Sequence, residues 1–301
     1  MAAVTRVCLT MLVAALAAGT AYGAAAAVTA TDDAGNVVTL ARPARRIVSL
    51  APHATELLFA AGAGARVVGV VAHSDWPREA RGLPGVGDAN ALDLERIVAL
   101  APDLVVAWPY TMPSQLATLR ARGATIFVSD PKSIAGIARD VDALGMLAGT
   151  TAVAGPAADA LRARHGALAA RYAGAAPINV FYEVWNDPLQ TIGGRHLISE
   201  AITLCGGANV FAALTQPAPT ISFEAVVAAA PEAIIAGSDD GRRPAWLDDW
   251  QRWRDVPAVR YGNLFIADGD LMHRSGPRFV DGVEALCAML NRARAHRALK
   301  R

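Results

Sequence analysis

The sequence predicts an α/β fold of two Rossmann-like lobes, each built on a central, mostly parallel sheet, joined by one long helix. Short aliphatic strands alternate with helices in both halves of the chain, which is the pattern of βαβ units. A segment of the first half also returns in the second: "DLERIVALAPDLVVAW" begins at Asp93, and "SFEAVVAAAPEAIIAG" begins at Ser222. Their glutamates, Glu95 and Glu224, lie 224 − 95 = 129 positions apart, and the proline that follows each has the same offset. This repeat indicates that the two halves of the chain share one fold.

In the first half, four buried strands alternate with three helices. "HATELLFAAGAG" is expected to be helical up to its glycine stop, "DLERIVAL" to be a helix that Asp93 caps, and "MPSQLATLRARG" to be the third helix. No strand is assigned to residues 31–44 or to the Pro- and Gly-rich loop at 73–92. The strands are expected at Ile47–Leu50, Val67–Val71, Asp103–Trp108 and Ala124–Ser129.

A stretch without strands links the two halves. Ser133–Leu147 has apolar residues at helical spacing, and a second helix is expected over Ala157–Tyr172, with Pro156 in its first turn. A helix of about 20 residues spans on the order of 30 Å, which is long enough to bridge two lobes. The alternative is a pair of helices packed inside one domain.

The second half repeats the alternation. Strands are expected in "INVFYEVW", "EAIIAG" and "NLFIAD", and helices in "HLISEAITLCGG", "ISFEAVVAAA" and the closing "RFVDGVEALCAMLNRARAHRAL". The expected division is therefore an N-terminal α/β lobe at 27–132, a helical segment with the interlobe helix at 133–173, and a C-terminal α/β lobe at 174–301.

Residues 1–26 have the pattern of a secretory signal peptide, with Arg6, an apolar run over Val7–Ala18, and small residues suited to cleavage. The run is short for a membrane span, and a retained N-terminal anchor is the alternative. Cleavage would remove Cys8 and leave Cys205 and Cys287. In an oxidising compartment these two are candidates for a disulfide within the C-terminal lobe, the alternative being two separate buried thiols.

The composition excludes several functional classes. With a formal net charge of +1 and 18% charged residues, the chain has no electrostatic footprint for nucleic acid, and its 53% hydrophobic content is typical of a globular protein. No P-loop, H-E-x-x-H or G-x-S-x-G motif occurs. The six histidines are scattered, so no metal site is predicted, and a zinc or manganese carrier is a remote alternative.

Aromatic and polar side chains follow four of the predicted strands. In open α/β sheets, ligands bind outside the carboxyl ends of the strands, so two lobes that face each other there would form an aromatic-walled cleft. Core packing is the alternative role for each single aromatic residue. The candidate ligand-binding residues are His73, Trp76, Trp108, Tyr110, Trp185, Gln190, Asp270, His273 and Arg274.

Four segments, "RIVSLAPHATELLFAAG", "DLERIVALAPDLVVAW", "LCGGANVF" and "HRSGPRF", resemble the substrate-binding proteins of metal-chelate ABC importers, and among them the cobalamin-binding members. The resemblance runs from about Arg45 to Leu299 and includes the pattern Ser-x-x-Pro-x-x-Thr-Glu at Ser49–Glu56. It implies the class III periplasmic binding protein fold, in which one rigid helix joins the lobes. It also implies a binding function without catalysis and without a cofactor.

The resemblance assigns roles to the repeated glutamates and to the cysteines. Glu95 and Glu224 fall where the family has two surface glutamates that dock into arginine pockets of a dimeric membrane permease. The alternative is that each glutamate only favours the first turn of its helix through the helix dipole. Cys205 and Cys287 fall at the positions of the family's disulfide.

The resemblance matches part of the ligand pocket. Trp108, Asp270 and Arg274 correspond to cleft positions of the cobalamin-binding members. Two further cleft tryptophans of those members fall at Ala89 and Ala218 in this chain. The ligand of this chain can therefore differ from theirs.

We expect an exported, monomeric, periplasmic carrier that captures cobalamin or a related corrinoid between its lobes and delivers it to a permease dimer in the inner membrane. One alternative is a haem- or ferric-siderophore-binding protein of the same fold, in which His73, Tyr110 or His273 would be the axial ligand of haem. A remote alternative is a periplasmic enzyme that uses Asp270, His273 and Arg274 as an acid–base set.

Overall fold

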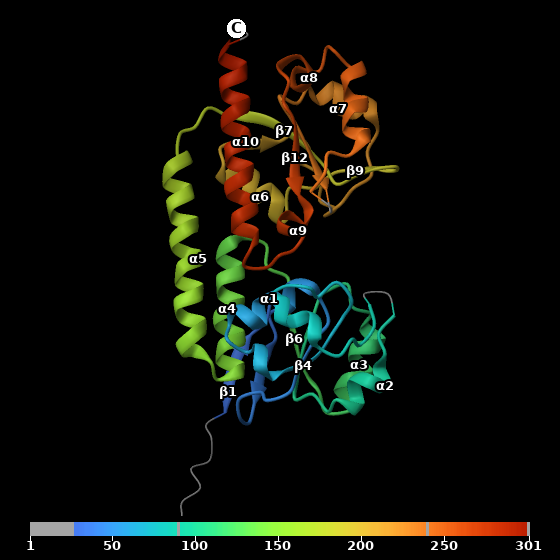
Figure 1. The fold of residues 1–301 in the computed structure, drawn as a ribbon, viewed down its shortest axis with the longest axis vertical. Coiled ribbons are helices and arrows are strands. Elements are labelled where there is room, and N and C mark those ends of the chain that lie inside the picture. The colour runs from blue at the N-terminus through green and yellow to red at the C-terminus, as the bar shows by residue number, and fades with distance from the viewer. Residues whose placement is uncertain (1–26, 89–90, 239–240, 300–301) are drawn as a thin grey trace, which may run out of the picture.

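The structure of the chain is a computed structural model that describes residues 27–88, 91–238 and 241–299. Two lobes lie one above the other along the long axis, and a long helix runs beside both of them (Figure 1). Each lobe has a four-stranded sheet in which every strand pair is parallel. This is the predicted fold class. The signal peptide expected at residues 1–26 lies outside the described residues.

The N-terminal lobe contains the four strands that the sequence predicts, in the spatial order β4-β3-β5-β6. The side chains of the central strand β5 alternate between two hydrophobic clusters, Leu104 and Val106 in one and Val105 and Ala107 in the other. The sheet is therefore covered on both faces. The elements are β3 (Ile47–Ser49), β4 (Val67–Val70), β5 (Leu104–Ala107), β6 (Thr125–Val128), α1 (Pro52–Ala60), α2 (Leu94–Ala99), α3 (Pro113–Ala121) and the 3₁₀ helices η1 (Gly64–Arg66) and η2 (Arg78–Gly82).

An antiparallel hairpin of β1 (Val28–Thr31) and β2 (Val37–Leu40) precedes this sheet, so the expectation that residues 31–44 hold no strand was wrong. The turn between the strands is closed by the Asp32 carboxylate, which accepts a hydrogen bond from the Asn36 backbone N–H at 2.7 Å. The Asp33 backbone N–H donates to the Val128 carbonyl at 3.0 Å, which ties the hairpin to β6. The hairpin was missed because the turn lies in a polar run without apolar periodicity.

Two helices lie between the two sheets in the sequence, α4 (Ile134–Ala148) and α5 (Thr151–Tyr172). Pro156 is the sixth residue of α5 and does not lie in its first turn, so the expected start of this helix at Ala157 was wrong. Packing explains the longer helix, because Ala154 lies so close to Gly145 of α4 that a Cβ there would come within 2.1 Å of the Ala154 Cβ. Burial against α4 holds the first turns of α5 although proline supplies no N–H.

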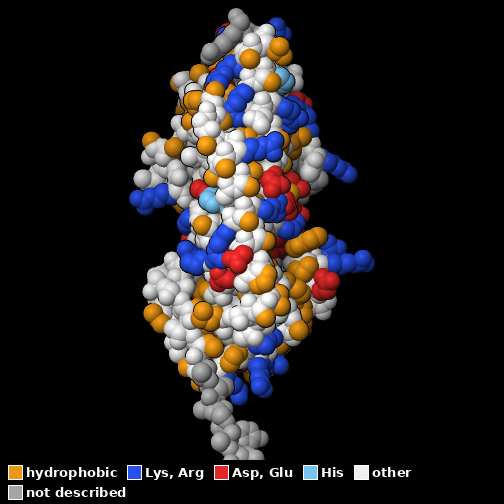
Figure 2. Space-filling view, turned by 90° about the vertical axis from the view of Figure 1, so that its left-hand side faces the viewer, with side chains coloured by type: hydrophobic (Ala, Val, Ile, Leu, Met, Phe, Trp, Pro, Cys, Tyr) orange, Lys and Arg blue, Asp and Glu red, His pale blue; other side chains and the backbone are white. Residues whose placement is uncertain are grey.

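At 22 residues, α5 is about 33 Å long and reaches both lobes. It packs on α1 and α4 of the N-terminal lobe and on α6 (Leu197–Leu204) and α10 (Phe279–Leu299) of the C-terminal lobe. Arg164 of α5 pairs with Asp281 at 2.6 Å and with Glu284 at 2.8 Å, both on α10. Figure 2, which faces this side of the molecule, shows acidic and basic side chains gathered around its middle. The helix therefore bridges the two lobes, as the sequence predicts.

The C-terminal lobe has the strand order β10-β7-β11-β12. Its three longer strands and the helices α6, α7 and α10 were predicted, whereas the short β10, the β8–β9 hairpin, the short helices α8 and α9 and the 3₁₀ helix η3 were not. The further bounds are β7 (Ile178–Glu183), β8 (Trp185–Asn186), β9 (Leu189–Gln190), β10 (Gly207–Asn209), α7 (Phe223–Ala229), β11 (Ala233–Ser238), η3 (Ala245–Arg252), α8 (Pro257–Tyr261), β12 (Leu264–Asp268) and α9 (Gly269–Met272).

A disulfide joins Cys205, at the end of α6, to Cys287 in α10. Both side chains are fully buried, and both helices belong to the C-terminal lobe. The predicted bond is therefore confirmed, and it fastens one lobe internally. Among the helices in the described ranges, none combines the length and the apolar character that a membrane span requires.

Candidate functional site

The carboxyl ends of the two sheets face each other. Asp75 follows β4 in the N-terminal lobe, and Arg274 follows β12 and α9 in the C-terminal lobe. The Arg274 guanidinium donates to the Asp75 carboxylate at 2.6 Å, so the segments beyond the two strand ends are in contact across the junction of the lobes. This is the arrangement in which α/β proteins bind ligands.

On the N-terminal side, aromatic rings line the end of β5. The rings of Trp108 and Tyr110 meet edge to face with centroids 4.6 Å apart, and Tyr110 is 60% exposed. His53 lies behind Trp108, with its Nε2 at 3.3 Å from the Ser129 carbonyl. Burial lowers the pKa of His53 to about 4, so its imidazole is neutral at physiological pH. An aromatic pair of one exposed ring, Tyr110, and one half-buried ring, Trp108, backed by a neutral histidine, suits a large, partly apolar ligand.

The loop after β4 carries His73 and Trp76. His73 is exposed, and its backbone has a φ of 64°, in the left-handed region. Trp76 is 46% exposed and lies against the guanidinium of Arg278 in the other lobe, 4.6 Å from the ring centroid. Trp76 therefore stands at the junction of the lobes, in contact with the C-terminal lobe.

On the C-terminal side, Trp185 and Gln190 lie on the β8–β9 hairpin, where Trp185 is exposed and donates to the Asp187 carbonyl at 2.8 Å. His273 follows α9, and its Nε2 is 3.2 Å from the Tyr182 hydroxyl at the end of β7. The structure thus brings His273 to the end of a neighbouring strand, β7, whereas Trp185 lies on the separate β8–β9 hairpin.

Arg274 is surrounded by three carboxylates. Besides Asp75, it contacts Asp270 at 2.9 Å and Glu56 at 3.5 Å. The hydrogen bond from Arg274 is the main cause that holds the pKa of the Asp75 carboxyl below its usual range. Asp270 and Arg274, two of the predicted ligand-binding residues, are therefore in direct contact.

Sequence reasoning missed Glu56, Asp75 and Arg278. One signal was available for Glu56, because "HATELLFAA" places a carboxylate between apolar residues of one helix. Of the two positions at which the resemblance implies cleft tryptophans in the cobalamin-binding members, Ala89 lies outside the described residues and Ala218 is exposed in the loop before α7.

Glu183, at the end of β7, is a buried acid next to the cleft. Its carboxylate accepts a hydrogen bond from the Trp250 indole N–H at 2.8 Å, and desolvation raises its pKa to about 8. In the unfolded state Glu183 loses its proton near pH 4.5, whereas in the folded state it keeps this proton up to about pH 8. The stabilisation that comes from the protonated Glu183 is therefore complete below pH 4.5 and is lost as the pH rises through 8.

We expect the variant Glu183→Gln to gain stability relative to the wild type as the pH rises from 5 to 8. Glutamine keeps the shape and the acceptor for Trp250 but has no proton to lose. The difference in free energy of unfolding should grow by about 1 kcal/mol for each pH unit. Urea denaturation at pH 5, 6.5 and 8 measures it. A difference that stays constant over this range would show that Glu183 is already ionised in the folded protein.

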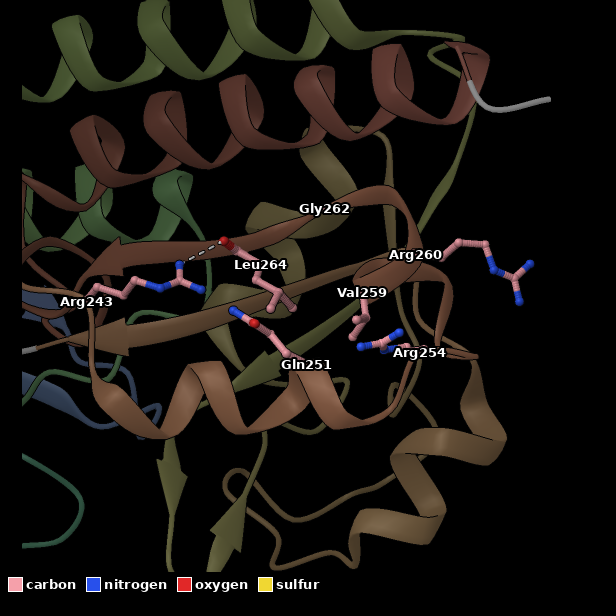
Figure 3. Close-up of a pocket in the computed structure, with 7 residues that line it drawn as sticks. All are labelled: Arg243, Gln251, Arg254, Val259, Arg260, Gly262 and Leu264. Carbon is pink, nitrogen blue, oxygen red and sulfur yellow. Dashed lines mark hydrogen bonds between the residues drawn. The ribbon is translucent and has the colours of Figure 1, made fainter.

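A second hollow, of about 680 Å³, lies on the C-terminal lobe between η3 and β12 (Figure 3). Three arginines line it, and one of them, Arg243, pairs with Asp248 at 2.6 Å and donates to the Leu264 carbonyl at 3.2 Å. Gly262 and Leu264, which also line the hollow, mark the beginning of β12, whereas Arg274 follows its end. The hollow is therefore separate from the candidate cleft.

The repeated glutamates occupy equivalent places in the two lobes. Glu95 and Glu224 are both exposed in the first turn of a short helix, α2 and α7. The residue two positions before each glutamate caps the start of the helix. Asp93 accepts a hydrogen bond from the backbone N–H of the third residue of α2 at 2.9 Å, and Ser222 accepts one from the backbone N–H of the third residue of α7 at 3.2 Å. Hydrogen bonds from its own backbone N–H and from Ser222 lower the pKa of the Glu224 carboxyl.

The backbone repeats as well. Ala101 and Ala230 follow the two helices, and both have left-handed conformations, with φ of 44° and 46°. Their separation, 230 − 101 = 129, is that of the glutamates. In Figure 1, α2 and α7 both lie on the side of the molecule opposite α5. The two carboxylates are thus carried by equivalent, exposed helix starts on one side.

Residues 47–271 match the family model described as periplasmic binding protein. The chain belongs to the periplasmic binding protein family. A protein from Vibrio cholerae named Vitamin B12-binding protein is 37% identical over 250 residues, which cover 82% of this chain and 90% of the relative. A protein of the same name from Photorhabdus laumondii is 35% identical, with 82% and 88% covered.

Solved structures of this family have the same fold. The periplasmic vitamin B12 binding protein BtuF of Vibrio cholerae matches with a TM-score of 0.76 and 36% identity, over 84% of this chain and 98% of that one. The periplasmic heme-binding protein RhuT from Roseiflexus matches with a TM-score of 0.71 and 27% identity, over 83% and 99%. This periplasmic binding protein is therefore a ligand carrier by family, and its relatives do not support the enzyme alternative.

Proposed function

We propose that this periplasmic binding protein is the substrate-binding component of an ABC importer that captures cobalamin, or a related corrinoid, between its lobes. The observation that carries the proposal is the 37% identity with a vitamin B12-binding relative over 90% of that relative. In this proposal, the segments at the ends of β4, β5, β7 and β12 supply the side chains that contact the ligand. Residues 1–26 are removed on export to the periplasm, and the lobes correspond to 27–132 and 174–301, with the helical segment 133–173 between them.

The chemistry of the cleft suits a corrinoid. The macrocycle is large and flat, so its burial against Trp108 and Tyr110 would remove apolar surface from water. Its peripheral amides need hydrogen-bond partners, which Asp270 and Arg274 offer on the opposite lobe. In this proposal, His73, Trp76, Gln190 and His273 form the rim of the cleft.

Delivery uses the exposed glutamates. In this proposal, Glu95 and Glu224 bind arginines on the two equivalent subunits of a dimeric permease, so one carboxylate from each lobe serves one subunit. Charge-assisted carboxylate–guanidinium pairs fix orientation and register more than they add affinity. The protein acts as a monomer, because a two-fold permease offers one such pair of sites to a single bilobal chain.

Titration calorimetry with cyanocobalamin, haemin and a ferric siderophore, in parallel, tests the ligand. We expect cyanocobalamin to bind with a Kd below about 1 μM. The variant Trp108→Ala should weaken binding by about tenfold or more, since a buried aromatic anchor typically contributes more than 1 kcal/mol. Trp253→Ala, which removes a partly exposed tryptophan after η3, is the matched control and should bind as the wild type does.

Haem is the second candidate, because a heme-binding relative at 27% identity has the same fold and Tyr110 and His273 stand at strand ends as candidate axial ligands. Sub-micromolar binding of haemin alone, with a Soret band that Tyr110→Phe or His273→Ala removes, would overturn the corrinoid assignment in favour of haem.

A further inference from the structure

Glu56 is a buried carboxylate at the junction of the two lobes. It belongs to α1 of the N-terminal lobe and is only 3% exposed. Arg278 of the C-terminal lobe binds it through two hydrogen bonds, from Nε at 3.0 Å and from Nη2 at 2.6 Å. Arg274 approaches the same carboxylate at 3.5 Å. Two positive side chains of one lobe thus converge on one buried acid of the other.

A hydroxyl network fixes the start of α1, and with it Glu56, in the N-terminal lobe. The Thr55 hydroxyl donates to the Ser49 hydroxyl at 2.8 Å, and the Thr55 and Ser74 hydroxyls are 3.1 Å apart. Ser49 ends β3, and Ser74 lies in the loop after β4, so α1 is joined to the ends of two strands. Ser49, Thr55 and Glu56 are members of the Ser-x-x-Pro-x-x-Thr-Glu pattern.

The segment of the C-terminal lobe that carries Arg274 and Arg278 packs closely against Glu56. Gly276 lies between the two arginines in sequence, and a Cβ at this position would come within 2.8 Å of the Glu56 Oε2. A side chain larger than hydrogen would therefore push the segment away from α1. Arg278 also covers the ring of Trp76, so the same arginine contacts two elements of the N-terminal lobe.

We propose that Glu56 is a positioning residue that sets the spacing of the two lobes and holds Arg274 at the edge of the cleft. The Glu56–Arg278 pair is bidentate and buried, so solvent and salt weaken it little. Arg274 also pairs with Asp75, whose side chain is 45% exposed, so this outer contact is the one that a ligand can replace. The pattern around Ser49 thus supports a contact between the lobes as well as the turn into α1.

Distance measurements between the lobes test this directly. Spin labels at exposed positions, introduced as Arg120→Cys on α3 and Arg252→Cys on η3, report the separation by double electron–electron resonance. Cys205 and Cys287 are joined in the disulfide and do not react, and the third cysteine, Cys8, belongs to residues 1–26, which the proposed mature protein lacks. We expect Glu56→Gln to give a longer and broader distance distribution than the wild type, without any ligand present.

The matched control is Glu232→Gln. Glu232 also pairs with an arginine, Arg297, at 3.0 Å, with both side chains 17% exposed, but the two belong to the same lobe. This variant should lose stability without changing the distance between the lobes. Arg278→Lys keeps the positive charge but loses the two-point contact with Glu56, so it should give a distance distribution between those of the wild type and Glu56→Gln. If Glu56→Gln does not fold, this variant alone tests the positioning role.

The consequence for the ligand rests on the proposed function. We expect cyanocobalamin to dissociate about tenfold faster from Glu56→Gln, because Arg274 loses one of its partners and the lobes are less constrained. Wild-type distances in both Glu56→Gln and Arg278→Lys would overturn the role of Glu56. If the wild type binds no corrinoid but the distances change as expected, the proposed ligand is wrong and the positioning role stands.

Discussion

Replacing both Glu95 and Glu224 by alanine is expected to abolish corrinoid uptake by cells while the purified protein still binds its ligand. Both carboxylates are exposed at the starts of equivalent helices, so their removal leaves the core intact. Each lost hydrogen-bonded contact with a permease arginine should reduce docking by about 1.5–3 kcal/mol, and the two together by on the order of 10³-fold. Uptake of labelled cyanocobalamin, measured beside calorimetry on the same variant, separates docking from capture.

The control for this double variant removes two exposed carboxylates elsewhere. Asp159 of α5 and Glu284 of α10 each pair with an arginine on the surface, far along the chain from the proposed docking helices. Asp159→Ala with Glu284→Ala should take up cyanocobalamin as the wild type does. Equal losses in the two double variants, or normal uptake without Glu95 and Glu224, would contradict the docking role.

Removing the disulfide should have the largest effect on stability. The bond between Cys205 and Cys287 closes a loop with a sequence separation of 82 residues. In the chain-entropy account, a loop of this size contributes about 4 kcal/mol by restricting the unfolded state. We therefore expect Cys205→Ala with Cys287→Ala to lower the free energy of unfolding by about this amount, as measured by urea denaturation.

A reductant provides the control for the cysteine variant. It should destabilise the wild type by a similar amount and leave the double variant unchanged, because only the wild type has a bond to reduce. If the oxidised wild type and the double variant had the same midpoint in urea, the bond would contribute nothing to folding. The loss should appear in the C-terminal lobe first, since both cysteines belong to it.

Buried strands were predictable from the sequence because both faces of a parallel sheet are covered. β5 and β11 are continuous aliphatic runs between a helix stop and a loop, which is the pattern of a strand buried on both faces. The short strands β1, β2 and β10 were not predictable in this way. Their pairing depends on turn hydrogen bonds and on an available sheet edge, which apolar periodicity does not encode.

The start of α5 shows how tertiary packing overrides a local signal. Pro156 is typical of a first helical turn, and the sequence alone favours a start there. The fit of Ala154 against Gly145 adds turns before it, and such a fit between two helices cannot be read from either segment alone.

Candidate site residues could be proposed from the sequence where they follow predicted strands. Asp270 and Arg274 were proposed in this way, and their side chains lie 2.9 Å apart. Glu56 and Arg278 are 278 − 56 = 222 positions apart and meet only because the lobes are stacked. A contact of this kind requires the relative placement of the two halves, which composition and spacing do not supply.

A crystal structure of the protein with cyanocobalamin would show whether the ligand lies between the lobes. We expect electron density for the corrin ring there, in contact with Trp108 on one side and with Asp270 or Arg274 on the other. Density for the ligand outside the junction of the lobes, such as in the arginine-lined hollow beside Arg243, would contradict it.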